Sequence, residues 1–374
     1  MNEDKSTRYH RLKRRISIAS IGLSVLLLGG LTWTGASVAM RVVADAVAAR
    51  VAGAGWVESA AVVVYVFILS VINEIVSLPL SIFGGYVVER RYGLSNESLV
   101  RWGLDEAKSS GIGLALGCGA GLLIYALVRV SPDNWWLMAG LLFALVVLGL
   151  TSVAPVLLLP LFYTVRPLAR ESLRARLLAL AERTGARVLG AYEWGLSEKT
   201  KKANAALTGI GGTRRILVSD TMLAEYSDDE IEVVLAHELA HHVHGDIWKG
   251  MAFEAGLILA GFYLASRVLA ALSGSIGLQS VADPAGLPLL LLAAGGVSLV
   301  MLPVAHAMSR AHERSADRFA LDLTNNPGAF ISAMRRLGAQ NLAEEHPSKV
   351  VQWLFYSHPP IRERIAAAEA FGAR

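Results

Sequence analysis

Six apolar segments of the chain are each long enough to cross a lipid bilayer as a helix. The hydrocarbon core of a bilayer is about 30 Å thick, so a helix of about 20 residues spans it. Backbone polar groups find no water inside lipid, and a helix pairs them internally. We therefore expect a mainly α-helical integral membrane protein with about six transmembrane helices, at residues 16–40, 60–88, 109–130, 134–162, 250–272 and 287–310.

The overall composition agrees with a membrane protein and excludes two other classes. Hydrophobic residues make up 54% of the 374 residues and charged residues only 18%, unlike the composition of a water-soluble enzyme or a disordered chain. The net charge of +4 comes from dispersed basic residues. We therefore expect the lipid bilayer as a partner and no nucleic acid.

Lysines and arginines are concentrated in alternate connections between the apolar segments. Such residues are retained preferentially on the cytoplasmic side of a membrane. Six precede residue 16 and four lie within 89–108, whereas 273–286 contains none. This pattern predicts that both termini and the water-facing part are cytoplasmic. The basic start and apolar core also resemble a cleaved secretory signal, but the length of the core and the five spans that follow favour an uncleaved anchor.

Several polar residues interrupt the apolar segments, which is costly unless they face protein or water. They are Asn73, Glu74, Glu254, Arg267 and His306. One interpretation is that they form ion pairs or extend to the membrane interface. The other is that they line a water-filled cavity between the helices.

The water-facing part combines a helix pattern with strand patterns. Residues 170–184 carry leucines at helical spacing between charges, which predicts an amphipathic helix. An exposed edge of a small sheet could bind an extended peptide as an additional strand. We expect such a sheet, antiparallel, from three segments at 187–193, 203–208 and 214–219.

The sequence His237-Glu238-Leu239-Ala240-His241 is the strongest functional signal in the chain. Ser227 and Glu230 are spaced as a capping box at the start of the helix that carries it. Histidines four residues apart lie about 40° apart around a helix, so both can bind one metal ion. Zinc held in this way activates a water molecule for attack on a peptide bond, and the glutamate accepts the proton.

A third metal ligand would have to come from another helix. Glu313 is a candidate, and Asp317, one turn later, could accept a hydrogen bond from the far nitrogen of a metal-bound histidine. The alternative is an ordinary solvated charged helix. The single cysteine, Cys118, lies in an apolar segment, which leaves histidines and carboxylates as ligands. His358, next to two prolines, is either structural or able to donate to the oxyanion of a tetrahedral intermediate.

At these motifs the sequence resembles the membrane-integral zinc metallopeptidase family of the type I CAAX prenyl endopeptidase, also called the a-factor-converting enzyme, in its bacterial form. The resemblance covers most of the chain from the second apolar segment onward. The matching elements are Leu78-Pro79-Leu80-Ser81 with Glu89 and Tyr92-Gly93-Leu94, Pro160-Leu161-Phe162 with Pro167-Leu168, Asn204-Ala205, the motif from His237 to His241, the segment from Glu313 to Asp317, and His358-Pro359-Pro360 with Glu363-Arg364.

The resemblance implies a role for each matching site residue. His237, His241 and Glu313 would bind one zinc ion, and Glu238 would be the catalytic base. His358 would help to hold the tetrahedral intermediate. The expected function is therefore that of a membrane-embedded zinc-dependent endopeptidase acting on a peptide or protein substrate, with prenylated and membrane-bound substrates among the candidates.

Further residues and the domain organisation follow from the same resemblance. Asn204 and Ala205 would lie on the sheet edge that pairs with substrate, and Asp317 and Arg364 would support the metal site. The expected organisation is a membrane domain of four spans at 1–163 and a gluzincin-like α+β zinc peptidase domain at 164–374, interrupted by the spans at 250–272 and 287–310. The membrane would be the inner or plasma membrane of a bacterium.

Two departures from the family bear on the substrate. The eukaryotic members resemble seven-span proteins, whereas this chain has six apolar segments. His242-Val243-His244-Gly245-Asp246 resembles instead the bacterial heat-shock-induced membrane proteases of the same superfamily. Quality-control cleavage of membrane proteins is therefore an alternative to CAAX processing. A non-catalytic scaffold or carrier of lipid or peptide is a remote alternative, because a site that only binds has no need of Glu238.

Overall fold

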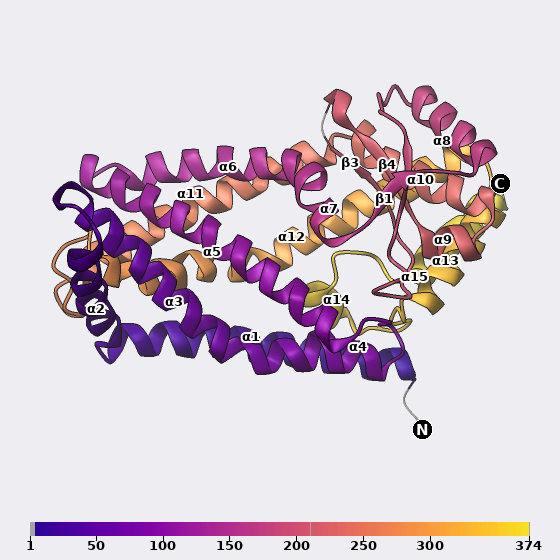
Figure 1. Ribbon diagram of the computed structural model, residues 1–374. Coiled ribbons are helices and arrows are strands. Elements are labelled where there is room, and N and C mark those ends of the chain that lie inside the picture. The colour runs from indigo at the N-terminus through magenta and orange to yellow at the C-terminus, as the bar shows by residue number, and fades with distance from the viewer. Residues whose placement is uncertain (1–3, 210, 374) are drawn as a thin grey trace.

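The computed structural model describes residues 4–209 and 211–373. Long helices lie side by side in an elongated bundle, and the sheet with most of the shorter helices is gathered at one end (Figure 1). Both termini lie at that end. The long helices are α1 (Lys5–Trp33), α3 (Val57–Ser81), α5 (Leu99–Val130), α6 (Trp135–Leu157), α11 (Asp246–Leu272) and α12 (Leu287–Thr324).

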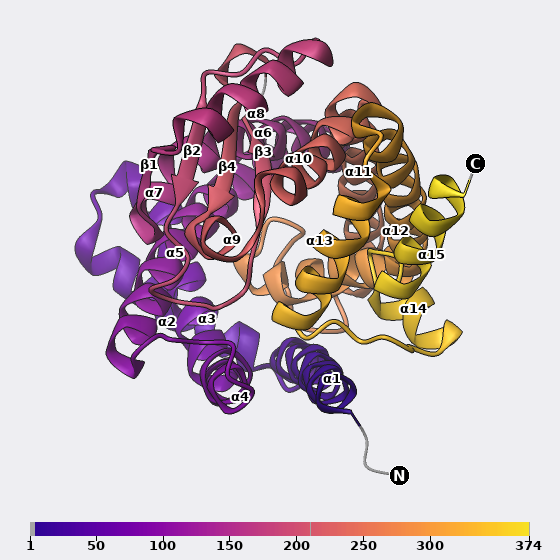
Figure 2. The same cartoon turned by 90° about the vertical axis from the view of Figure 1, so that its right-hand side faces the viewer.

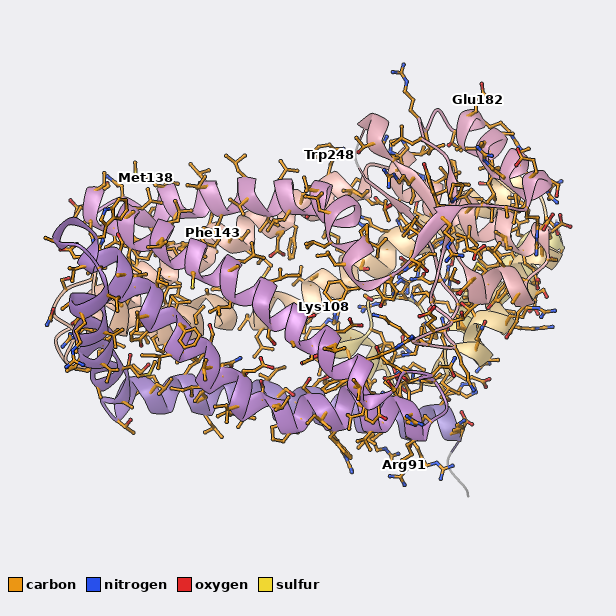
Figure 3. The ribbon with its side chains drawn as sticks, in the orientation of Figure 1. Arg91, Lys108, Met138, Phe143, Glu182 and Trp248 are labelled. Carbon is orange, nitrogen blue, oxygen red and sulfur yellow. The ribbon has the colours of Figure 1, made fainter. Side chains whose placement is uncertain are left out.

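The long helices coincide with the six predicted apolar segments. Within the described residues, five helices are long and apolar enough to cross a membrane, and the apolar stretch of α6, Trp135–Thr151, is shorter. The prediction of a mainly helical membrane protein is thereby confirmed. Figure 3 shows Met138 on the outer side of α6 and Phe143 on the side facing the other helices.

The first predicted segment, 16–40, ends too late. Helix α1 stops at Trp33, and a second helix, α2 (Ala36–Val51), begins after Gly35. Gly35 has φ +77°, a left-handed conformation that glycine adopts without a steric penalty, so the chain turns there. Helix α2 lies at the end of the bundle away from the sheet (Figure 1), where its Arg41 forms a buried ion pair with Asp283.

A proline interrupts the backbone hydrogen bonding of α3 near its C-terminal end. Pro79 lies inside α3, where it cannot donate a backbone hydrogen bond. A π-helical turn, Ile82–Val87, follows it and leads into α4 (Val88–Arg91). Wider turns of this kind accommodate a local irregularity without ending the helix.

The sheet has four strands in the order β1-β2-β4-β3. The expectation of an antiparallel sheet was wrong for one pair, because β2 and β4 run parallel. The chain reverses once between β2 and β3 and again between β3 and β4, so β4 returns in the direction of β2 and fits between the two. Strand β3 is left at the edge. The strands are β1 (Val165–Pro167), β2 (Ala191–Trp194), β3 (Ala205–Thr208) and β4 (Arg215–Ser219).

Helices on one side of the sheet share its hydrophobic core. The predicted amphipathic helix is α8 (Glu171–Arg183), whose Leu173 and Leu177 are fully buried. Figure 2 shows the sheet beside α10, with α13 and α15 beyond it. The remaining helices in this part are α7 (Leu159–Phe162), α9 (Asp220–Glu225), α10 (Asp228–Val243), α13 (Pro327–Gln340), α14 (Lys349–Phe355) and α15 (Ile361–Gly372).

A cavity of about 760 Å³ lies between the long helices. Asn73 and Glu74 from α3 and Glu254 from α11 all line it. Charged and amide side chains at membrane depth are tolerated when they face such a space. For these three residues, the arrangement favours the cavity interpretation over an outward position in lipid.

Candidate metal centre

Helix α10 carries the two histidines of the His-Glu-x-x-His motif into the core. Its first turn has the predicted capping box: the backbone N–H of Glu230 donates to Oγ of Ser227, and the backbone N–H of Ser227 donates to the Glu230 carboxylate at 2.8 Å. Most of the apolar residues between the cap and His237 are buried. The cap and this packing fix the rotation of the helix, and therefore the direction in which His237 and His241 point.

Glu313 of α12 joins these histidines at one point in space. Its Oε2 lies 3.2 Å from Nε2 of His237, and its Oε1 lies 3.4 Å from Nε2 of His241. One ligand atom from each of the three side chains lies within 4.8 Å of the other two. His237 and Glu313 are buried, whereas His241 is half-buried.

The chemistry of these donors fits a metal ion. Oε2 of Glu313 is buried and has no hydrogen-bond partner of good geometry, although an imidazole nitrogen is close to it. A buried carboxylate oxygen without a partner is costly. Two imidazole nitrogens and a carboxylate oxygen that face one point are a common ligand set for a transition metal that keeps a further position open.

A carboxylate lies next to the far nitrogen of each histidine. Asp317 Oδ1 is 2.9 Å from Nδ1 of His237, and Asp246 Oδ2 is 3.1 Å from Nδ1 of His241. An Nδ1–H that donates to a carboxylate leaves Nε2 free as the metal-binding atom. Asp246 did not emerge from the sequence as a site residue. The sequence signal that could have identified Asp246 is its position, five residues after His241 and directly after a glycine. Gly245 has φ +66°, and the chain turns back there.

Arg364 lies behind Asp317. Its Nε donates to Asp317 Oδ2 at 2.8 Å and its Nη2 donates to Oδ1 at 2.5 Å, a two-point contact that fixes the carboxylate. Nη2 is also 3.3 Å from Nδ1 of His237. The side chains of Arg364 and Asp317 are both buried, so the pair is shielded from solvent.

The pKa values reflect this buried arrangement of opposite charges. Burial alone would lower the pKa of His237, but the adjacent carboxylates of Asp317 and Glu313 raise that pKa to about 9. Burial raises the pKa of the Glu238 carboxyl, and the neighbouring Glu313 carboxylate adds to the rise, although nearby His237 opposes it. A glutamate with a raised pKa beside a metal-ligand set is well suited to accept a proton.

His358 reaches the same cluster from the turn before α15. Its Nε2 lies 3.3 Å from Oε1 of Glu313, and its Nδ1 is 2.8 Å from Oγ of Ser357. The imidazole side chain is 61% exposed. Burial of part of the ring lowers the pKa of His358. The position is that of a side chain at the mouth of the site.

Asn204 and Ala205 lie at the edge of the sheet, apart from the three metal-ligand candidates. Asn204 accepts a hydrogen bond from the Ser219 backbone at 2.9 Å, so its backbone groups face β4. The backbone N–H and C=O groups of successive residues point to opposite sides of a strand. Those of Ala205 and Leu207 therefore point away from β4, toward the free edge. His244, three residues after the motif, contacts Ser315 and Phe319 on α12.

Sequence comparisons match the chain in two consecutive parts. A profile described as peptidase family M48 matches residues 167–371. A second profile, described as the N-terminal part of CAAX prenyl proteases with five membrane helices, matches residues 2–164.

Individual relatives extend over most of the chain. The uncharacterized metalloprotease YhfN of Bacillus subtilis is 34% identical over 84% of this chain and 76% of its own length. CAAX prenyl protease 1 of Saccharomyces cerevisiae is 27% identical over 81% of this chain and 70% of its own length. The crystal structure of S. mikatae Ste24p shares the fold, with a TM-score of 0.82 and 23% identity over 97% of this chain and 87% of that chain.

Proposed function

The chain belongs to peptidase family M48, and from this membership we propose that it is a membrane-embedded zinc endopeptidase of the gluzincin type. The observation that carries the proposal is the meeting of His237, His241 and Glu313 from α10 and α12. Two histidines and one glutamate are a zinc ligand set of peptidases, with a fourth position for water. Glu238, between the two histidines, is the proposed base.

Each residue of the site has a defined task in this proposal. When bound, zinc would polarise the scissile carbonyl and lower the pKa of a water molecule. Glu238 accepts the proton of the attacking water and passes it to the leaving amine. His358, at the mouth of the site, donates a hydrogen bond to the oxyanion that develops on the carbonyl. Asp317 and Arg364 keep His237 in the tautomer and orientation that binding requires.

The free edge of β3 is the proposed place for the substrate backbone. An extended peptide that pairs with Ala205 and Leu207 would add a fifth strand to the sheet. Ala205 packs in the same core as α10, so a strand added at this edge would lie near the helix that holds the histidines. Asn204 is the residue directly before β3.

The surroundings of β3 favour a substrate with an apolar group. A hollow of about 370 Å³ adjoins Asn204 and is walled by Phe162, Tyr163 and Trp194. A prenyl chain or a large apolar side chain suits such a wall. This supports CAAX-type processing, as the names of several relatives suggest, with quality-control cleavage of membrane proteins as the second candidate.

The location proposed is a bacterial inner or plasma membrane with the peptidase part in the cytoplasm. Both termini and the site lie at one end of the bundle (Figure 1), which is also the end of the lysine- and arginine-rich connections. Protease added to sealed inverted membrane vesicles is expected to reach residues 171–183.

Cleavage assays in proteoliposomes test the function and separate its alternatives. The protein is given a prenylated CAAX peptide, the same peptide without the prenyl group, and an unfolded membrane protein. Faster cleavage of the prenylated peptide supports CAAX-type processing, and preference for the unfolded protein supports quality control. A zinc-loaded protein that cleaves none of them and co-purifies with lipid or peptide would overturn the proposal in favour of a carrier.

A further inference from the structure

The segment that carries His358 is tied to helix α12 by a buried arginine. Nη1 of Arg310 donates to the backbone carbonyl of Gln352 at 2.9 Å and to that of Tyr356 at 2.6 Å. Arg310 is only 8% exposed. It lies three residues, almost one turn, before Glu313 on the same helix, and Tyr356 is two residues before His358.

Helix α1 holds the same segment from the opposite direction. Nη1 of Arg14 donates to Oε2 of Glu344 at 2.5 Å and to the Tyr356 hydroxyl at 3.1 Å. The Tyr356 hydroxyl in turn donates to Glu344, which is buried. His10 reaches the Leu342 carbonyl, 2.8 Å away.

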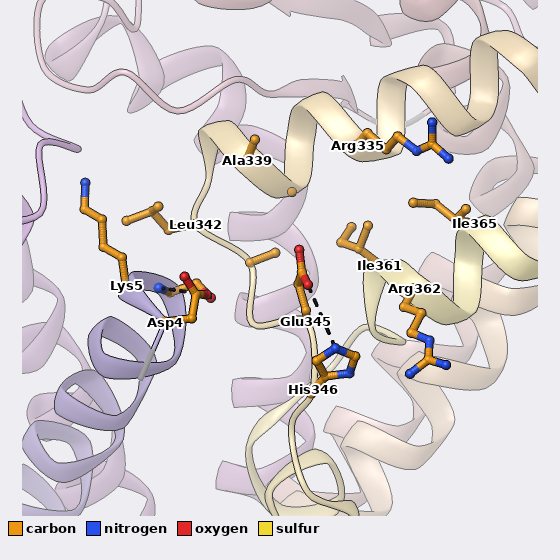
Figure 4. A pocket seen from close by; sticks show the side chains of 13 residues that line it. Asp4, Lys5, Arg335, Ala339, Leu342, Glu345, His346, Ile361, Arg362 and Ile365 are labelled. Atoms are coloured by element: carbon orange, nitrogen blue, oxygen red, sulfur yellow. Dashed lines mark hydrogen bonds and ion pairs between the residues drawn. The ribbon is translucent and has the colours of Figure 1, made fainter. Parts of the chain in front are cut away.

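The start of α1 is close to this part of the peptidase domain as well. Figure 4 shows Asp4 and Lys5 facing Glu345 and His346, which belong to the loop after α13, across a cavity of about 790 Å³. The amino-terminal helix is therefore joined to the chain that leads into the active site by more than one contact.

These contacts matter because the His358 side chain has little packing of its own. With 61% of its side chain exposed, the imidazole depends on the backbone of residues 356–358 for its position. Tyr356 is the C-cap residue of the short helix α14, and its backbone N–H donates to the Gln352 carbonyl. The Arg310 cation donates to the same Gln352 carbonyl and to the carbonyl of Tyr356, and it opposes the partial negative charge of the helix end.

We propose that Arg310 is the positioning residue for His358, with Arg14 of α1 as a second support. This inference rests on the proposed role of His358 in the peptidase reaction. Helix α12 then provides both the Glu313 carboxylate and the arginine that fixes the chain bearing His358. The 3.3 Å between His358 Nε2 and Glu313 Oε1 then depends on the contacts that Arg310 makes with the segment bearing His358.

A double-mutant cycle between Arg310 and His358 tests the inference. In zinc-loaded protein, Arg310→Gln is expected to lower kcat about 10- to 100-fold, as loss of a supporting contact around a metal site does, with KM within about twofold of wild type and unchanged zinc content. In the His358→Ala background the same substitution should cost less than about threefold, because residues that act through one another are non-additive.

Conservative and control variants complete the experiment. Arg310→Lys should recover part of the kcat, because an ammonium group also donates to carbonyl oxygens. Arg318→Gln changes an exposed arginine of the same helix and should behave like wild type. Arg14→Gln should lower kcat in the same direction, through the Tyr356 hydroxyl.

Hydrogen exchange provides a readout that is independent of activity. In the metal-free protein, amides 356–358 should exchange faster in Arg310→Gln than in Arg318→Gln, while those of α10 stay unchanged. If Arg310→Gln does not fold, Arg310→Lys is carried through the same cycle.

The outcomes separate this inference from the proposed function. Full kcat in a folded Arg310 variant, or a loss that multiplies with that of His358→Ala, overturns the positioning role. A wild-type protein that cleaves no peptide overturns the proposed function instead.

Discussion

The carboxylate of Asp246 lies 3.1 Å from Nδ1 of His241 and reaches it across the boundary between α10 and α11. Asp317 approaches Nδ1 of His237 from α12 at 2.9 Å. Each imidazole of the candidate metal site is thus oriented by a carboxylate that lies on another helix. The two carboxylates differ in their own partners: Asp317 is fixed by Arg364, whereas Asp246 contacts the partly exposed Lys249.

Replacement of either carboxylate should weaken metal binding. Asp317→Asn and Asp246→Asn are each expected to lower zinc affinity about 10- to 100-fold, because the tautomer and orientation of the histidine are no longer fixed. Competition with a chromogenic chelator measures the change in purified protein. Asp322→Asn, at an exposed position on α12, is the control. Unaltered affinity in both test variants would refute an orienting role.

Glu238→Gln should stop cleavage without loss of metal. The amide keeps the size of the side chain but cannot accept a proton, so kcat is expected to fall by at least about 100-fold. Zinc content, measured by mass spectrometry of the purified protein, should equal that of wild type. Glu232→Gln, on the same helix but in contact with Arg176, is the matched control. Undiminished turnover in Glu238→Gln would contradict the proposed mechanism.

Periodicity and charge predicted those parts of the fold that depend on local sequence. The six apolar segments, the helix of Leu173 and Leu177 and the capping box of Ser227 are all set by residues within a few positions of one another. The end of the first helix before Gly35 was not predicted, because a single glycine in an apolar segment does not by itself indicate a left-handed turn. The parallel pairing of β2 with β4 was missed because strand order depends on contacts between distant segments.

The same limit applies to the site. The spacing of His237 and His241 shows one shared face of a helix, and the charged positions of α12 offered Glu313. Arg310 could not be singled out, because its partners Gln352 and Tyr356 are distant in sequence. Asp246 is only five residues from His241, but the left-handed turn at Gly245 that brings the two together was not predicted. Arg310 in particular reads as the basic end of an apolar segment, and only its contacts with Gln352 and Tyr356 reveal a different role.

The edge of β3 can be tested with a substitution that removes one backbone donor. Leu207→Pro deletes an N–H that faces the free edge and leaves the hydrogen bonds to β4 in place. Leu207→Ala controls for the loss of the side chain. If substrate pairs at this edge, KM for a peptide should rise about tenfold in the proline variant relative to the alanine variant, about the value of one hydrogen bond. Equal KM values would exclude pairing at Leu207.

Glu230 should make the stability of the peptidase domain pH-dependent. Burial would raise its pKa, but hydrogen bonds from Ser332 and the Ser227 backbone and the charge of Arg336 lower it below the ordinary 4.5. A lowered folded-state pKa means that the ionised form stabilises the fold. This contribution is fully present above about pH 4.5 and is lost as the pH falls through the folded-state pKa.

Glu230→Gln is the corresponding experiment. At pH 7 the variant should lose about 2 kcal/mol of stability, since a buried set of hydrogen bonds loses its charged acceptor. Thermal melting in detergent should show a lower Tm at pH 7 and a smaller difference from wild type below pH 4.5. Glu182→Gln, at an exposed position on α8, is the control. A difference in Tm that stays constant with pH would contradict the assignment.

Glu313 follows His241 by 72 residues, and the hairpin of α11 and α12 lies between them. During synthesis the two histidines leave the ribosome before Glu313. The Glu313 carboxylate can reach them only after α11 and α12 have crossed the bilayer as a hairpin. In a nascent chain that is not inserted into the membrane, Glu313 is therefore not brought to the two histidines. The ligand set of the candidate metal site is therefore complete only in a chain whose α11–α12 hairpin has folded.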